Sequence, residues 1–180
     1  VHFHNVDRNF YMSSGCGVCG TRTIEGLRRK YERPDPLETQ EPGFDLREET
    51  ISLLPAKVKE MQTLFSLTGG VHAAGLFDVN GTLIEVKEDV GRHNAVDKVI
   101  GSQFRRYNLP LKDNLLVVSS RASYDIVQKA VSACIPMIVA VGAPSSLAID
   151  LSQQYGITLV GFARENSFNV YSGHQRIKYA

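Results

Sequence analysis

The sequence predicts an α/β fold, in which helices flank a largely parallel, mixed sheet. Strand-like and helix-like segments alternate through the second half of the chain, and the links between them are short, which is typical of layered α/β domains. A hairpin signal, Asn80-Gly81, precedes this alternation. Hydrophobic residues make up 43% of the 180 positions, which is enough for one buried core.

The composition excludes several classes of protein. Twenty basic against nineteen acidic side chains leave a net charge of +1, so the chain has no global field for nucleic acid or an anionic membrane. The longest apolar run, residues 133–144, contains Pro136 and Gly142 and is shorter than the ~20 residues of a membrane span. Two of the three cysteines share one motif, which favours a cytoplasmic protein with redox, metal or sulfur chemistry over a disulfide framework.

Residues 1–50 are expected to form a separate N-terminal part. Residues 8–12 have the composition of a short strand and lead into a Gly-rich loop at residues 13–20. Residues 32–50 hold seven acids, two arginines and three prolines, which predicts an exposed, poorly ordered connection. The α/β domain then occupies residues 51–180. Because the chain starts at Val1 without a signal peptide, we expect a fragment or a processed form.

Two elements are expected before the alternating part. A helix should begin at Pro55, which suits a first turn, and it should end at Gly69-Gly70. Strands at residues 71–79 and 82–86 should follow, joined by a type I′ turn at Asn80-Gly81, since that turn needs positive φ at both positions.

The remaining elements alternate in type. Apolar spacing predicts helices near residues 94–106, 123–133 and 145–155, and strands at residues 115–119, 137–141, 157–162 and 168–171. The last strand should pair at an edge of the sheet. Cys134 shares one helical face with apolar residues, and we interpret it as a small buried hydrophobe.

The most informative chemical feature is Cys16-Gly-Val-Cys19. Two thiols at this spacing can share a metal, form a disulfide, or act as a nucleophile with a resolving partner. The glycines around them leave backbone N–H groups exposed, and such groups favour a thiolate. A structural role for the pair is the less favoured reading.

Three metal or redox readings of this motif fit less well. His72 and His93 could complete a zinc site, but a structural site usually supplies its second ligand pair at close spacing. A zinc deaminase has its histidine motif before the cysteine pair, whereas here the order is reversed. A thioredoxin-type motif opens a helix, and Gly20 is a poor helix start.

The chain resembles the formate dehydrogenase accessory sulfur carrier family (FdhD). The matching stretches occur in the family's order between residues 12 and 171: Ser14-Gly-Cys-Gly-Val-Cys-Gly20, Thr68-Gly-Gly-Val-His-Ala-Ala74, Glu88-Asp-Val-Gly-Arg-His-Asn-Ala-Val-Asp-Lys98, Ser119-Ser-Arg-Ala-Ser123, Gly142-Ala-Pro-Ser-Ser146 and Gly161-Phe-Ala-Arg164. Together these motifs are very specific. The family has a further N-terminal region before the cysteine loop, which we expect to be missing here.

The resemblance implies both a fold and an activity. The family's fold is similar to that of cytidine deaminases. A cysteine desulfurase would donate a persulfide sulfur to Cys16, with Cys19 assisting by tuning the thiolate or releasing the sulfur. The sulfur would pass to Mo-bis(molybdopterin guanine dinucleotide), or its tungsten form, before insertion into formate dehydrogenase. The cofactor is thus a bound substrate, and we expect no permanently bound metal ion.

Three strand ends could hold an anionic dinucleotide, because such ligands bind at the carboxyl ends of parallel strands. These ends are Ser119-Ser-Arg-Ala-Ser123, Gly142-Ala-Pro-Ser-Ser146 and the segment after the last parallel strand. Each serine alone is more readily a helix cap, and Ser145 or Ser146 is a plausible one. The resemblance assigns cofactor contacts to Phe162, Ala163, Arg164, Glu165, Asn166 and Ser167.

Other residues in these motifs are given supporting roles. His72 and His93 are not expected to be catalytic, and Asp89, Arg92 and Asp97 are expected to serve as helix-terminus and salt-bridge partners. Residues 13–20 and 32–50 should be poorly ordered without ligand, whereas the surroundings of Ser145 and Arg164 should be ordered.

Two functional hypotheses follow. The first is a cytoplasmic sulfur carrier, with cysteine desulfurase, formate dehydrogenase and the pterin cofactor as partners and neither nucleic acid nor membrane among them; a homodimer stays open. The second, from another class, is a structural zinc-binding adaptor that docks formate dehydrogenase without catalysis.

Overall fold

The computed structural model describes residues 44–179. The predicted strand at residues 8–12, Cys16, Cys19 and most of the charged connection lie outside these residues. The elements in chain order are β1 (Leu46–Arg47), α2 (Glu48–Glu60), α3 (Thr63–Thr68), β2 (His72–Asp78), β3 (Leu83–Asp89), α4 (Arg92–Arg105), β4 (Asn114–Val118), α5 (Tyr124–Ser132), β5 (Met137–Ala140), α6 (Ser146–Gln154), β6 (Thr158–Arg164), β7 (Ser167–Ser172), the 3₁₀ helix η1 (His174–Arg176) and β8 (Ile177–Lys178).

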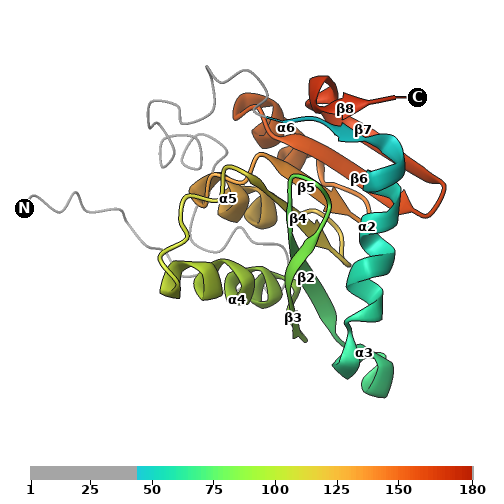
Figure 1. The fold of residues 1–180 in the computed structure, drawn as a ribbon, viewed down its shortest axis with the longest axis vertical. Coiled ribbons are helices and arrows are strands. Elements are labelled where there is room, and N and C mark those ends of the chain that lie inside the picture. Colours follow the sequence, from blue (N-terminus) through green and yellow to red (C-terminus); the bar gives the residue numbers. More distant parts are fainter. Residues whose placement is uncertain (1–43, 180) are drawn as a thin grey trace, which may run out of the picture. The chain divides into compact units, whose positions relative to one another are not determined.

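A six-stranded sheet in the order β3-β2-β4-β5-β6-β7 forms the centre of the domain (Figure 1). The pairs β4–β5 and β5–β6 are parallel. The pairs β2–β3, β2–β4 and β6–β7 are antiparallel. The layered α/β architecture predicted from the sequence is confirmed.

The expectation of a largely parallel sheet holds only at its centre. The helices α5 and α6 connect β4 to β5 and β5 to β6, and such helical crossovers make these strands parallel. Both sides of this centre are antiparallel hairpins, β2–β3 and β6–β7, because short turns connect their strands. The sheet is therefore mixed, with antiparallel pairings in the majority.

Helices cover both faces of this sheet. The helix α2 contacts β4, β5 and β6, α4 contacts β2 and β3, and α6 contacts β6 and β7. One core cluster joins Ile51, Leu54 and Val58 of α2 to alternate strand residues, namely Leu115, Val117, Met137, Val139 and Val160. Their neighbours Leu116, Ile138 and Leu159 are also fully buried. Because strand side chains alternate between faces, these three point toward α4, α5 and α6.

A single helix was predicted from Pro55 to Gly69-Gly70, but the structure has two helices in this range, because α2 ends at Glu60 and α3 spans Thr63–Thr68. The predicted start at Pro55 was also wrong, since α2 begins at Glu48. Pro55 lies inside the helix, where its ring removes one backbone hydrogen bond. The apolar stripe starts earlier, since Ile51 and Leu54 are fully buried. Part of the connection that we expected to be poorly ordered, residues 46–50, instead forms β1 and the first turn of α2, and β1 pairs with β8. The division expected at residue 50 falls within α2.

The hairpin at Asn80-Gly81 is confirmed, but its turn is not type I′. Gly81 has a φ of 76°, whereas Asn80 is not among the residues with positive φ. The Asp78 carboxylate instead holds the turn, accepting the N–H groups of Asn80 at 2.9 Å and Thr82 at 2.8 Å. Lys57 Nζ of α2 donates to the Gly81 carbonyl at 2.6 Å, which ties the turn to the helix layer.

Within residues 44–179, no helix combines the length and the apolar character that crossing a bilayer requires.

Candidate functional site

The loops that follow β4 and β5 lie against each other and against the last residues of β6, at the carboxyl ends of these strands. Gly142 N–H donates to the Ser120 carbonyl at 3.0 Å, and Ser145 N–H donates to the Ala122 carbonyl at 3.0 Å. Phe162 N–H donates to the Gly142 carbonyl at 3.2 Å. The structure therefore brings together the three strand ends that the sequence singled out.

Two glycines allow this close approach. A Cβ atom on Gly142 would lie 3.0 Å from the backbone of Arg121, and one on Gly161 would lie 2.8 Å from Cδ of Pro144. Both distances are shorter than ordinary contacts, so a larger residue at either position would push the loops apart.

The serines of these loops bond to the protein itself. Ser119 Oγ accepts the Ala73 N–H at 2.8 Å, and the Ser120 hydroxyl donates to the Arg121 carbonyl at 3.0 Å. Ser145 Oγ accepts the Ala148 N–H at 3.2 Å and caps α6, which confirms the predicted cap. These serines thus position the loops, and the Arg121 side chain is exposed beside them.

The segment assigned to cofactor contacts, residues 162–167, spans the end of β6, a tight turn and the start of β7. The pairing register shifts between Gly161 and Arg164. At this irregularity Phe162 adopts a φ of 53°, which is uncommon for a bulky residue. The ring is 41% exposed, whereas the next side chain, Ala163, is 1% exposed. The bulge therefore turns an aromatic ring outward while the strand stays in the sheet.

Part of this segment lines a cavity of about 770 Å³ beside α2, which we call the α2 cavity. Its walls come from α2, from the segment between α3 and β2, and from the ends of β4, β5 and β6. The lining residues are Pro55, Ala56, Val58, Lys59, Gln62, Phe65, Gly69, Gly70, Val71, His72, Val117, Ser119, Val141, Ala163, Arg164 and Glu165. A cavity of this size can hold a small ligand.

The rest of the segment faces a different hollow. Asn166 and Ser167 line a groove of about 590 Å³ along β7, together with Glu48, His174 and Tyr179 among others. Phe162 lines neither hollow. The six residues are thus divided: Ala163, Arg164 and Glu165 belong to the α2 cavity, whereas Asn166 and Ser167 belong to the groove.

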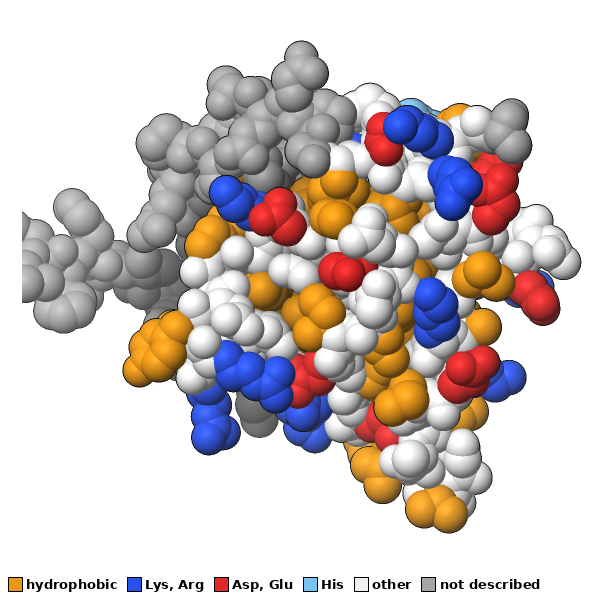
Figure 2. Space-filling view, viewed as in Figure 1, with side chains coloured by type: hydrophobic (Ala, Val, Ile, Leu, Met, Phe, Trp, Pro, Cys, Tyr) orange, Lys and Arg blue, Asp and Glu red, His pale blue; other side chains and the backbone are white. Residues whose placement is uncertain are grey.

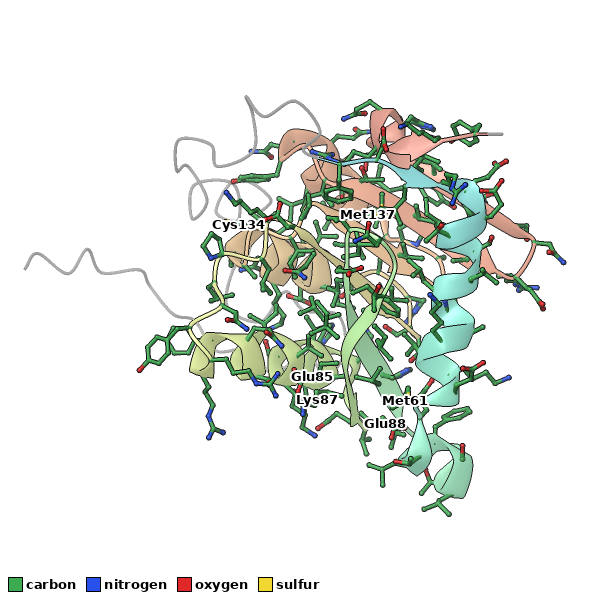
Figure 3. The ribbon with its side chains drawn as sticks, in the orientation of Figure 1. Met61, Glu85, Lys87, Glu88, Cys134 and Met137 are labelled. Atoms are coloured by element: carbon green, nitrogen blue, oxygen red, sulfur yellow. The ribbon has the colours of Figure 1, made fainter. Side chains whose placement is uncertain are left out.

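Glu88 at the end of β3 holds α3 beside the α2 cavity (Figure 3). Its carboxylate accepts the N–H groups of Leu64 at 2.9 Å and Phe65 at 2.8 Å. Burial acts to raise the pKa of Glu88, but these two amides, with the side chains of Gln62 and Thr63, outweigh burial and leave the pKa below its usual value. The carboxylate thus satisfies amides at the start of α3 that have no partner within the helix.

The two histidines are in different surroundings. His72 lines the α2 cavity, and burial, aided by the charge of Arg92, lowers its pKa. His93 lies in the first turn of α4, with Nε2 3.0 Å from Ser123 Oγ and 3.5 Å from Asp125 Oδ2. Burial also lowers the pKa of His93. Among residues 44–179, no group of three or more His, Cys, Asp and Glu side chains could hold a metal ion.

The acidic residues near these histidines serve as structural partners, as predicted. Asp89 forms an ion pair with Lys98 at 2.6 Å and accepts the Gly91 N–H at 2.8 Å. Asp97 pairs with Lys129 at 2.6 Å. On the face shown in Figure 2, basic and acidic side chains are interspersed over the described residues.

Cys134 differs from its prediction. The helix α5 ends at Ser132, and Cys134 follows it with a φ of 59° and is only partly buried (Figure 3). The helix stops because Pro136 is close, so Cys134 is not part of its apolar face.

The sequence analysis did not single out Lys59 and Gln62, which line the α2 cavity. Polar residues at the end of a helix form no recognisable motif, so the sequence gives no signal for them.

Three comparisons with known proteins agree with one another. The model of the FdhD/NarQ family matches residues 2–178. A sulfur carrier protein FdhD from Corynebacterium efficiens is 51% identical over 169 residues, which cover 94% of this chain and 59% of that protein. A protein of the same name from Sulfolobus acidocaldarius is 45% identical over 94% of this chain and 63% of its own length.

A solved structure gives the same picture. The crystal structure of a putative formate dehydrogenase accessory protein from Desulfotalea psychrophila matches with a TM-score of 0.69 and 34% identity, covering 75% of this chain and 60% of that one. The chain thus spans about 60% of the length of the curated relatives that it matches.

Proposed function

This chain belongs to the FdhD/NarQ family, and on that premise we propose that it carries sulfur as a persulfide on Cys16. A cysteine desulfurase supplies the sulfur in the cytoplasm, and Mo-bis(molybdopterin guanine dinucleotide), or its tungsten form, receives it before insertion into formate dehydrogenase. The names of relatives support a sulfur carrier linked to formate dehydrogenase. The donor, the acceptor and the persulfide are our proposal.

The α2 cavity is the observation that supports binding of the cofactor in this proposal. It lies at the carboxyl ends of β4, β5 and β6, where anionic ligands bind in open α/β sheets. Ala163, Arg164 and Glu165, half of the segment assigned to the cofactor, line it. Arg164 offers a planar set of donors that suits a phosphate of the guanine dinucleotide.

The loading step uses the chemistry of thiols. The Cys16 thiolate attacks the outer sulfur of the desulfurase persulfide, forms a new S–S bond and releases the desulfurase cysteine as a thiolate. Cys19 then has one of two roles. It stabilises the Cys16 thiolate, or it attacks Cys16 Sγ, releases the outer sulfur as sulfide and leaves a disulfide that a cellular dithiol must reduce.

Mass spectrometry of the loaded protein tests this function. After incubation with a cysteine desulfurase and cysteine, we expect one labile sulfur on the peptide that contains Cys16 and none in Cys16→Ala. Cys134→Ala is the matched control, because it removes the remaining thiol and should leave loading unchanged. An undiminished signal in Cys16→Ala would contradict the assignment. Stoichiometric zinc that is lost in Cys19→Ser would support the adaptor hypothesis instead.

A further inference from the structure

The end of α4 exposes two aromatic side chains and a cation, which together we call the α4-end patch. Phe104 is 67% exposed, and Tyr107, two residues beyond the helix, is 95% exposed. Arg105 between them is exposed as well and forms no ion pair within residues 44–179. Tyrosine and arginine side chains dominate the binding energy of many protein–protein interfaces, so this group has the composition of a docking surface.

A strained backbone holds Tyr107 outward. The N–H of Asn108 donates to the carbonyl of Gln103 at 3.0 Å, and the N–H of Tyr107 donates to the carbonyl of Phe104 at 3.0 Å, which is the hydrogen-bond pattern of a Schellman helix end. This pattern places Tyr107 in the left-handed region, with a φ of 59°, where glycine is the usual residue. A bulky side chain there costs stability, and a ring that is almost fully exposed gains nothing from burial.

A polar network holds this helix end in place. Gln103 Nε2 donates to the carboxylate of Glu85 in β3 at 2.9 Å, and Asn108 Nδ2 donates to Gln103 Oε1 at 3.0 Å. Arg106 lies 3.5 Å from the same carboxylate. The backbone that displays Tyr107 is therefore fixed before a partner binds, which lowers the entropy cost of binding.

The charges around the two aromatic rings indicate the chemistry of a partner. Residues 104–112 include three cations, Arg105, Arg106 and Lys112, and the first acid after them is Asp113. Glu85, which pairs with Arg106, has a side chain that is only 9% exposed. A partner surface with an apolar side chain bordered by Asp or Glu residues is complementary to this patch.

The α4-end patch lies away from the α2 cavity. The last turn of α4 is on the opposite side of the domain from α2 (Figure 1). The first turn of α4, by contrast, lies at the carboxyl ends of the strands, where His93 contacts Ser123. A protein that binds the α4-end patch can therefore stay bound while a ligand occupies the α2 cavity.

We propose that the α4-end patch is the docking surface for the cysteine desulfurase that loads Cys16. The inference rests on the proposed function. Formate dehydrogenase takes the cofactor from the α2 cavity and so has to approach the side of α2, whereas the sulfur donor acts while the cofactor is held there. Phe104 and Tyr107 contact an apolar side chain of the desulfurase, and Arg105 contacts the acids that border it.

Calorimetric titration of the whole chain with the desulfurase tests this surface. In Tyr107→Gly the Kd should rise at least about tenfold, while the midpoint of thermal unfolding rises by roughly 2–4 °C because glycine relieves the left-handed strain. Weaker binding by a more stable variant cannot be due to misfolding. Tyr179→Gly, which also removes an exposed aromatic side chain, is the control and should bind as wild type. A Kd for Tyr107→Gly equal to that of wild type overturns the proposal, and so does failure of the wild type to bind.

Charge reversal tests the acidic character of the partner. Arg105→Glu should raise the Kd and make it less dependent on salt. Arg47→Glu, at an exposed position in β1, is the matched control and should leave the Kd unchanged. Equal Kd values for Arg105→Glu and wild type would contradict a contact with acids.

Competition separates the desulfurase from other occupants of the patch. Saturating GDP, which carries the guanine and the diphosphate of the cofactor, should leave the desulfurase bound; displacement by GDP would overturn the proposal. If Tyr107→Gly loses binding to formate dehydrogenase, or loses self-association, while it binds the desulfurase as wild type does, the patch belongs to that other partner. Cys16→Ala should dock as wild type, so sulfur loading can fail while this inference stands.

Discussion

The N–H of Phe162 donates to the carbonyl of Gly142 at 3.2 Å, and this bond joins the end of β6 to the loop after β5. It forms where the β6–β7 register shifts and Phe162 takes a positive φ. Because Gly142 N–H also donates to Ser120, one residue connects all three strand ends. The positions of the Phe162 ring and of Arg164 therefore depend on how closely these loops approach one another.

Replacing Gly142 should disturb this connection. In Gly142→Ala the new Cβ would lie 3.0 Å from the Arg121 backbone, and overpacking of this kind typically costs ~1–3 kcal/mol. We expect a lower free energy of unfolding in urea and weaker GDP binding. Gly101→Ala is the matched control, since nothing lies within 4 Å of a Cβ at this helical position; it should stabilise α4 by ~0.5–1 kcal/mol. Equal stabilities of the two variants would contradict the close approach.

Arg164→Ala should weaken ligand binding with little effect on folding. The side chain is exposed and lines the α2 cavity, and a charge-assisted hydrogen bond to a phosphate contributes ~1.5–3 kcal/mol. The Kd for GDP should therefore rise about ten- to a hundredfold, and added salt should reduce the difference. Arg105→Ala, an exposed position in the last turn of α4, should leave the Kd unchanged. If the Kd for GDP is the same in Arg164→Ala as in wild type, Arg164 does not contact the nucleotide.

The predictions from sequence succeeded where local chemistry decides the structure. Ser145 caps α6 because its side chain and the third amide after it are close in the chain. Gly69 ends α3 in the left-handed conformation that glycine adopts most easily. The hairpin at Asn80-Gly81 formed for the same reason, although Asp78, four residues before Thr82, determines the form of its turn.

The structural features that the sequence could not predict depend on contacts between residues that are far apart in the sequence. The early start of α2 reflects packing of Leu46 and Ile51 in one cluster with Ile177, which lies near the other end of the chain. Gln62 and Lys59 line the α2 cavity because α2 crosses the face of β4 and β6. Neither residue belongs to a motif, so only the three-dimensional arrangement relates them to Arg164.

Acid should weaken the start of α4 in a defined pH range. The Lys98 side chain, the Gly91 N–H and the Asn94 amide lower the pKa of Asp89 from 3.8 to about 2. A carboxyl group whose pKa is lower in the folded state stabilises the fold above its unfolded pKa, and this contribution is lost as the pH falls toward the folded value. The difference in unfolding free energy between wild type and Asp89→Asn should therefore shrink from pH 4 to about pH 2. Asp113→Asn, at an exposed position without an ion pair among the described residues, is the control for the loss of one negative charge.

The last prediction concerns Glu88, which bridges β3 and α3. Without its carboxylate, the N–H groups of Leu64 and Phe65 lose their acceptors, and a helix of six residues with no buried side chain has little else to hold it. In Glu88→Ala we expect faster hydrogen exchange across residues 63–68 and weaker GDP binding, since Phe65 and Gly69 line the α2 cavity.

The comparison with Glu60→Ala separates this effect from the loss of a negative charge. Glu60 is the exposed last residue of α2, so its removal changes the net charge equally but leaves the amides of α3 paired. Exchange in α3 should therefore stay slow in Glu60→Ala. Because the pKa of Glu88 lies below its usual value, the wild-type protection should persist through mildly acidic pH and disappear only when the carboxylate is protonated. Equal exchange rates in the two variants would show that α3 is held by something other than Glu88.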